Sequence, residues 1–447
     1  MSRSTRRTLL AAACAAPLAI LACSKSTEAP TIPAIHVHPY SGDAQVGPVG
    51  WAVNLRPIVR VTDSVGNAIH GAVVTFAISA GGGSATSTST TTDLTGLAQV
   101  GSWTLGAAPG INSMTATVTQ TGFSDGQYVF TDTAVTPQFT IQLQYYGNYK
   151  PTAAESAAFN AAIAKWQQIV YRHIDTPGLV SDSANTCEAG DPALTNVSVT
   201  DVLILASFDS IDGPNKTLAE ASPCLARTDG QSAGLPVLGI IKFDTADVGT
   251  LVSGGQLNAV VEHEMGHVLG FGTLWSLGAP FPVVNCLQLP SNPGGTLNDT
   301  YFSCVGGTRY AAAAFDSVGG TSYTGAGQTF GSPVHVPPVE NCANSPYVYP
   351  TCGGGTINGH WRQTVFGNEL MVGFLPSSPA LSRVTAASLQ DLGYSVNYAA
   401  TDPYSHAFTA PPAAGAGARV NLGDDIHHGP LYGIDRTGHI KLVTKRQ

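Results

Sequence analysis

Two histidines four residues apart, His263 and His267, enclose a glutamate within a stretch of helical apolar periodicity. On a helix both imidazoles project from one face about one turn apart, within reach of a single metal ion. Zinc binds neutral imidazole nitrogens, so this spacing suits it. Glu264 lies to the side, where it can reach a water molecule without being a ligand. The pattern predicts one Zn²⁺ per chain with a general base beside it, against the alternatives of coincidence or a pair of surface histidines.

A zinc ion that does catalysis keeps one coordination position open, so a third protein ligand is needed. The compact pattern H-E-x-x-H-x-x-G-x-x-H is matched as far as Gly270, but its last position is Thr273. The residues alone therefore leave the third ligand open. The later histidines and glutamates that remain candidates are His335, His360, His406, His427, His428, His439, Glu340 and Glu369.

The elements that must position this site follow from local patterns. We expect a helix over residues 253–269, begun by a capping box of Ser253 and Gln256 and ended at Gly270. A second amphipathic helix is expected over 152–171, with Phe159 and Trp166 on its apolar face. Together with expected strands near 139–145, 202–206 and 235–243, these helices indicate an α+β layout. The run 235–243 is interpreted either as an edge strand that binds substrate or as a buried core strand.

Residues 36–135 have a different texture, with short β-branched runs separated by Gly-, Asn- and Ser-rich turns. This spacing predicts an all-β sandwich. The predicted division of the whole chain is a signal peptide over 1–22, a tether over 23–35, the sandwich over 36–135, an α+β part with the metal-binding helix over 136–272, a second part of it over 273–400 and a weakly patterned tail over 401–447.

The first residues indicate export. Three arginines precede an apolar run too short to span a membrane as a mature helix, and Ile20-Leu21-Ala22-Cys23 resembles a bacterial lipobox. We expect lipidation at Cys23 and a cell-surface or outer-membrane lipoprotein that is anchored or released. The alternative is an ordinary secretory signal in which Cys23 plays no part.

Six further cysteines are disulfide candidates, because an even number in an exported chain favours bridges. Pairing between neighbours in the sequence is our prediction, for Cys187 with Cys224, Cys286 with Cys304, and Cys342 with Cys352.

The composition limits the partners. The net charge is −9 over 447 residues, and no Lys/Arg cluster occurs beyond the first residues. We therefore expect no nucleic-acid partner. The expected partners are protein or peptide substrates, and the membrane through the lipid anchor.

Two resemblances extend this interpretation. The segment from His263 to Phe271, then Gly359-His360-Trp361-Arg362 and Gly367-Asn368-Glu369-Leu370-Met371, resembles the leishmanolysin family of metzincins. The resemblance implies that His360 is the third zinc ligand and that Met371 forms a turn beneath the metal. Family members often carry an inhibitory propeptide, whereas here the sandwich occupies that place and no inhibitory cysteine is evident upstream.

The second resemblance covers roughly residues 36–135. The segments 61–67, 71–76 and 92–98 resemble bacterial Ig-like domains of the invasin and intimin type, which serve as spacers or adhesive modules. The expected fold is thus multidomain, an Ig-like sandwich followed by an α+β zincin domain. We predict a zinc endopeptidase in which Glu264 is the general base. The alternative is a surface adhesin with an inactive zincin domain.

Overall fold

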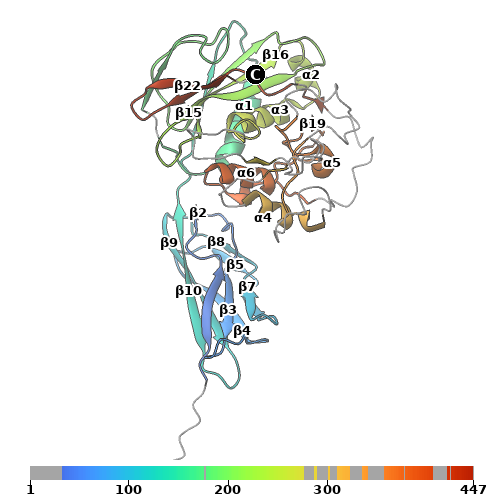
Figure 1. The fold of residues 1–447 in the computed structure, drawn as a ribbon. Helices are drawn as coiled ribbons and strands as arrows, with labels where there is room; N and C mark the ends of the chain where they lie inside the picture. Colours follow the sequence, from blue (N-terminus) through green and yellow to red (C-terminus); the bar gives the residue numbers. More distant parts are fainter. Residues whose placement is uncertain are drawn as a thin grey trace, which may run out of the picture.

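The computed structural model consists mostly of strands, with few helices, and has a sandwich attached to a larger second part (Figure 1). It describes residues 33–175, 178–275, 286–288, 301–302, 310–322, 335–340, 357–376, 378–405, 420–422 and 424–445. The predicted signal peptide and Cys23 lie outside these ranges, as do Cys304, Cys342 and Cys352.

The sandwich consists of two main sheets and a short third one. Their strand orders are β1-β3-β7, β2-β10-β9-β4-β6 and β5-β8. Alternation along the strands builds its core, since Val74 and Phe76 of β4 and Met114 and Val118 of β9 are buried around Trp103. The strand bounds are β1 (His36–Ser41), β2 (Val46–Pro48), β3 (Ile58–Thr62), β4 (Val73–Ala80), β5 (Ser84–Thr86), β6 (Ser89–Thr91), β7 (Leu97–Gln99), β8 (Ser102–Thr104), β9 (Gly110–Thr119) and β10 (Gly126–Val135).

A six-stranded mixed sheet forms the top of the second part, in the order β11-β14-β16-β15-β21-β22. The first three strands are parallel, and β15 runs antiparallel to β16. The last two strands come from the end of the chain. The bounds are β11 (Ile141–Tyr145), β14 (Val202–Asp209), β15 (Ala219–Arg227), β16 (Pro236–Asp244), β21 (Pro430–Ile434) and β22 (Ile440–Lys445), and a separate hairpin pairs β12 (Leu179–Asp182) with β13 (Leu194–Ser198).

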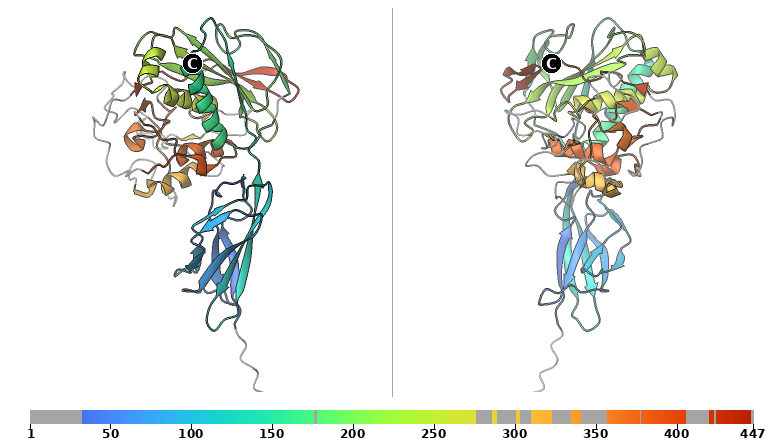
Figure 2. Two further views of the ribbon diagram at one scale, coloured as in Figure 1. Left: turned by 180° about the vertical axis from the view of Figure 1, so that it is seen from behind. Right: turned by 45° about the vertical axis from the view of Figure 1, so that its right-hand side comes forward.

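Two helices lie beneath this sheet, and the views agree on the layering (Figures 1 and 2). Helix α1 (Ala153–Ile169) begins at a capping box of Thr152 and Glu155 and buries Phe159 and Trp166. Helix α3 (Leu257–Val268) contacts α1, β15 and β16. The indole N–H of Trp166 donates to the carbonyl of Glu262 at 2.8 Å, which ties the two helices together.

Helices α4 (Tyr310–Ser317) and α6 (Arg383–Leu392) lie below these two helices, toward the sandwich (Figure 1). Helix α6 begins at Ser382, whose hydroxyl caps the first turn, and it contacts α4. The other bounds are α2 (Val248–Ser253), β17 (Leu287–Gln288), β18 (Tyr301–Phe302), η2 (Gly320–Ser322), α5 (Gln363–Phe366), β19 (Phe374–Leu375), η3 (Tyr398–Ala400) and β20 (Val420–Asn421).

Two details differ from the sequence predictions. The helix expected over 253–269 begins later, at Leu257, because Ser253 is the last residue of a separate helix, α2 (Val248–Ser253). The Ser253 hydroxyl donates to the Thr250 carbonyl at 3.1 Å instead of capping α3. The strand β16 has neighbours on both sides, so the interpretation of 235–243 as an edge strand is wrong and the core-strand alternative holds. The expected end at Gly270 is correct, because this residue has a φ of 110°.

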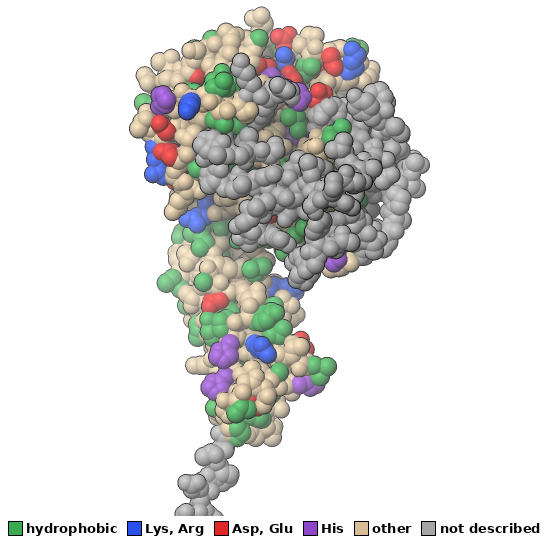
Figure 3. Space-filling view, in the orientation of Figure 1, with side chains coloured by type: hydrophobic (Ala, Val, Ile, Leu, Met, Phe, Trp, Pro, Cys, Tyr) green, Lys and Arg blue, Asp and Glu red, His purple; other side chains and the backbone are tan. Residues whose placement is uncertain are grey.

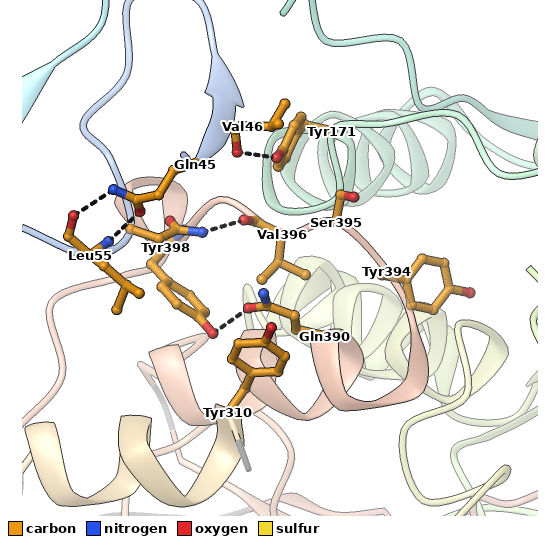
Figure 4. A pocket seen from close by; sticks show the side chains of 11 residues that line it. Gln45, Val46, Leu55, Tyr171, Tyr310, Gln390, Tyr394, Ser395, Val396 and Tyr398 are labelled. Atoms are coloured by element: carbon orange, nitrogen blue, oxygen red, sulfur yellow. Dashed lines mark hydrogen bonds between the residues drawn. The ribbon is translucent and has the colours of Figure 1, made fainter. Parts of the chain in front are cut away.

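Polar contacts join the sandwich to the second part (Figure 4). The Tyr171 hydroxyl donates to the Val46 carbonyl at 2.6 Å, and the Asn54 amide donates to the Val396 carbonyl at 2.8 Å. In return, the Tyr398 backbone N–H donates to the Asn54 side chain at 3.0 Å. A cavity of about 250 Å³ lies among these residues. The contact therefore fixes one end of the sandwich against the loops around α6.

Candidate metal centre

Helix α3 places His263 and His267 side by side with no solvent exposure. Their Nε2 atoms are 3.0 Å apart. The expected geometry, two imidazoles on one helical face, is therefore present.

His360 joins them from a segment almost one hundred residues further along. Its Nε2 lies 3.0 Å from that of His263 and 3.1 Å from that of His267, and its side chain is fully buried. A close approach of two backbones sets this position, because a Cβ on Gly272, just after α3, would stand 2.2 Å from the Gly359 carbonyl oxygen. Only glycine at 272 lets the His360 segment come so near.

The other ring nitrogens fix the tautomers of the two helical histidines. Nδ1 of His263 lies 2.7 Å from the Leu370 carbonyl, and Nδ1 of His267 lies 2.9 Å from the Phe271 carbonyl. A carbonyl only accepts, so each Nδ1 carries the proton and donates. The Nε2 atoms then present lone pairs to one another. Burial lowers the pKa of both histidines, which keeps them neutral.

A fourth side chain that the sequence did not single out completes the cluster. Oδ2 of Asp425 lies 3.1 Å from Nε2 of His360, 3.4 Å from that of His263 and 3.9 Å from that of His267. Asp425 is fully buried. Burial raises the pKa of this carboxyl, and a positively charged imidazole beside it, that of His360 foremost, would lower the pKa below its usual value.

These four atoms fit a tetrahedral ion. Ligands about 2.0–2.1 Å from a zinc ion at tetrahedral angles are separated from one another by roughly 3.3–3.4 Å. The six separations here run from 3.0 to 3.9 Å. Converging lone pairs of neutral imidazoles and a carboxylate repel one another unless a cation lies between them. The donor set of three nitrogens and one oxygen is one that Zn²⁺ accepts.

Glu264 lies beside the cluster without belonging to it. Its side chain is fully buried, and neither carboxylate oxygen has a hydrogen-bond partner among the described residues. Burial raises its pKa well above the usual value, and the nearby carboxylates of Asp425 and Glu220 add to that shift. A buried carboxyl without a partner is costly, so Glu264 is a candidate for a functional role at this cluster.

Met371 packs against α3 at Gly266, which lies between the two helical histidines in the sequence. A Cβ on Gly266 of α3 would stand 2.8 Å from both the sulfur and the methyl carbon of Met371. The backbone N–H of Met371 donates to the Glu369 carboxylate, which also accepts from the Ser382 hydroxyl at 2.8 Å. Glu369 therefore holds the turn and is not a metal ligand.

The other described candidates for the third ligand lie away from the two helical histidines, and His406 lies outside the described residues. Glu340 accepts from the Gln363 backbone at 2.7 Å, and His335 lies 2.8 Å from Asp316. His428 is exposed beside Asp424. His427, which is largely buried, forms a second group with Glu188 and Glu220 whose ligand atoms lie within 4.8 Å of one another. Among the described candidates, His360 is the one whose Nε2 lies beside those of His263 and His267.

Asp425 was missed because its segment is weakly patterned. The only sequence signal is the run Asp424-Asp425 shortly before His427-His428 in a stretch rich in Ala, Gly and Pro. We predicted a weakly patterned tail over residues 401–447, and this prediction is wrong for its last part. Residues 430–434 and 440–445 form β21 and β22 of the large sheet.

Cys187 and Cys224 form a disulfide, as predicted. Cys286 is also disulfide-bonded. Within the described residues, no helix is long and apolar enough to cross a bilayer. On the face drawn in Figure 3, Lys and Arg side chains are scattered among acidic ones and do not gather into a basic patch.

Comparisons with known proteins give weak structural similarity alone. No family model matches the sequence, and no curated protein matches it. Among solved structures, the chain is similar to the D00-D0 domain of intimin, at 20% identity over 22% of this chain and 46% of that one, with a TM-score of 0.18. The D0-D1 domain of intimin gives 18% identity over 24% of this chain and 56% of that one, also with a TM-score of 0.18.

A third similarity is to a Bacteroides ovatus GH5 xyloglucanase, at 11% identity over 40% of this chain and 38% of that one, with a TM-score of 0.17. The chain spans about half the length of the intimin structures that it matches. At these TM-scores none of the three similarities supports an inference about function. The resemblance to leishmanolysin stays a prediction from the sequence motifs.

Proposed function

We propose that this chain is a zinc-dependent endopeptidase of the metzincin kind, similar to leishmanolysin, carried on an exported Ig-like module. One observation supports it above the others. Three buried imidazole Nε2 atoms converge within 3.1 Å, and a buried glutamate without a hydrogen-bond partner lies beside them. His263, His267 and His360 would hold the metal. Met371 packs beneath them and takes no part in the chemistry.

Zinc bound there would supply Lewis acidity and a water of pKa about 7. Glu264 would accept the proton of that water as general base and pass it to the nitrogen of the leaving amine. Its raised pKa lets it hold the proton between those two events. The carbonyls of Leu370 and Phe271 keep two of the imidazoles in the tautomer that binds metal.

The experiment compares casein hydrolysis by the purified mature chain and by Glu264→Gln, with zinc content measured for both. Loss of the base should lower the rate by about two to four orders of magnitude while zinc stays bound. Equal, measurable rates in the two proteins would contradict the role of Glu264. Both proteins are also assayed with Asp425→Ala added, and absence of hydrolysis in every one of these zinc-loaded proteins would contradict the peptidase.

The position of Asp425 favours a second candidate. A metal with four protein ligands is typical of a structural site. In this alternative the chain is a surface adhesin, and the zinc centre holds the fold without doing chemistry. The same assay separates the two functions, because an adhesin would bind zinc and hydrolyse nothing in either background.

A further inference from the structure

The segment that carries Asp425 crosses the candidate site along a definite path. We call residues 420–422 and 424–428 the crossing segment. It begins with β20, which pairs antiparallel with β19 just after Met371. It then contacts the residue just before β15, where the Leu218 backbone N–H donates to the Leu422 carbonyl at 3.4 Å. It ends at β21, which pairs with the far half of β15.

Between these two ends the crossing segment pairs with the near half of β15. The Ala221 backbone N–H donates to the Asp425 carbonyl at 2.9 Å, and the His427 N–H donates to the Ala221 carbonyl at 3.1 Å. Ile426 thereby faces Ala221 in a parallel bridge. Since β21 pairs with Leu225–Arg227, this half of β15 has no other strand partner on that side among the described residues. A free strand edge is a surface on which an extended peptide binds.

The same segment fills the metal position that catalysis needs. The Asp425 side chain leaves the paired backbone and reaches all three Nε2 atoms at 3.1 to 3.9 Å. Backbone pairing on β15 and a ligand at the metal are the two contacts that an extended substrate would make beside Glu264. One segment of the chain makes both.

We infer that the crossing segment is an inhibitor built into the chain, which keeps the peptidase latent by pairing with β15 and by placing Asp425 in the fourth coordination position. This inference rests on the proposed function. The inhibitory role that family members often give to a propeptide upstream of the metal site is here assigned to a segment that follows it in the sequence. A substrate enters only after Asp425 and the backbone around it leave together.

The first test measures whether the bound metal has a coordination position open to an added ligand. The full chain is loaded with Co²⁺, and its visible spectrum is recorded with and without acetohydroxamate, a small metal ligand. Asp425→Ala should show a spectral change on adding acetohydroxamate, whereas the parent chain should show none. Asp424→Ala is the matched control, because the Asp424 side chain is 44% exposed and lies beside His428 instead of the metal cluster. An equal change in the parent would overturn the assignment of Asp425 as a ligand.

The second test measures casein hydrolysis by the zinc-loaded proteins. With the open state populated at roughly 10% or less, Asp425→Ala should be at least about tenfold faster than the parent. Asp424→Ala should match the parent. Equal, measurable rates in the parent and Asp425→Ala would overturn the inhibitor and leave the peptidase intact. No hydrolysis by any variant, with acetohydroxamate binding to Asp425→Ala, would overturn the peptidase and leave the ligand assignment intact.

Asp425→Asn is the second variant, for the case in which Asp425→Ala does not fold. It keeps the shape of the side chain and removes its charge, so it should behave as Asp425→Ala does in both tests. A folded Asp425→Asn that keeps its zinc, excludes acetohydroxamate and hydrolyses casein no faster than the parent would contradict the inhibitor.

Discussion

The sandwich and the metal-bearing part differ in how far apart their essential contacts lie in the sequence. In the sandwich, β4 and β9 build a core from residues that alternate along each strand. In the metal-bearing part, the four groups at the centre come from α3, from the segment at His360 and from the end of the chain. Alternation is a local property, whereas convergence of distant segments is set by packing. We therefore expect the sandwich to stay folded when the metal centre is damaged, and the metal centre to stay intact when the core of the sandwich is damaged.

The largest effect is expected for His360→Ala. Loss of one ligand from a site worth about 10–16 kcal/mol should weaken zinc binding at least about a thousandfold. Zinc content after dialysis against a chelator series measures it. His428→Ala is the control, since that exposed side chain lies away from the cluster. An unchanged zinc affinity in His360→Ala would refute the ligand assignment.

Trp103→Ala should act on the sandwich alone. Trp103 is fully buried in its core, and truncation of such a ring costs about 3–5 kcal/mol. Its indole N–H has no hydrogen-bond partner among the described residues, so we expect about 3 kcal/mol, the lower end. Denaturant unfolding of the full chain measures this, with Leu94→Ala, at an 83% exposed site, as control. A parallel loss of zinc would break the independence of the two regions.

Met371→Leu should have a smaller effect on the metal-bearing part. The swap nearly conserves volume, so the free energy of unfolding should fall by less than about 1.5 kcal/mol. Zinc stoichiometry should stay at that of the parent, because the Met371 sulfur packs on Gly266 and does not join the four ligand atoms. A variant that folds but loses zinc would show that Met371 positions the ligands.

A further effect, seen only when the pH changes, is expected for the sandwich. Burial raises the pKa of Asp132 to about 6, with help from Asp43 and against hydrogen bonds from Gln45. The unfolded carboxyl ionises near pH 4 while the folded one keeps its proton. The stability of the sandwich should therefore fall as the pH rises from about 4 to about 6. Asp132→Asn should flatten this slope in unfolding curves taken across that range. An unchanged slope would place the titration elsewhere.

Elements with a strong local pattern were predictable from the sequence. The face of α1 around Trp166, the end of α3 at Gly270, the pair His263 and His267 and the bridge of Cys187 follow from periodicity, spacing or pairing rules. The capping box at Ser253 failed because a second helix, α2, ends there. Serine is a favoured helix N-cap, but Ser253 is already the last residue of α2.

The fourth member of the metal cluster was not predictable, for a physical reason. A lone aspartate carries no periodic signal, and its role depends on β21 and β15 pairing across two hundred residues. The interpretation of β16 as an edge strand failed for the same reason, because it also depends on pairing between distant segments. The apolar run of β16 indicates burial, but which strand lies at the border depends on where the last strands pair.

The crossing segment is held by strand pairing on both sides of Asp425, to β19 before it and to β15 after it. A group tethered in this way meets its target at an effective concentration that is millimolar for short flexible links. Dilution of the protein therefore does not release it. If the proposed function holds, a separate peptide that competes for the β15 edge must reach comparable concentrations, and only an abundant, extended substrate would displace Asp425 by itself.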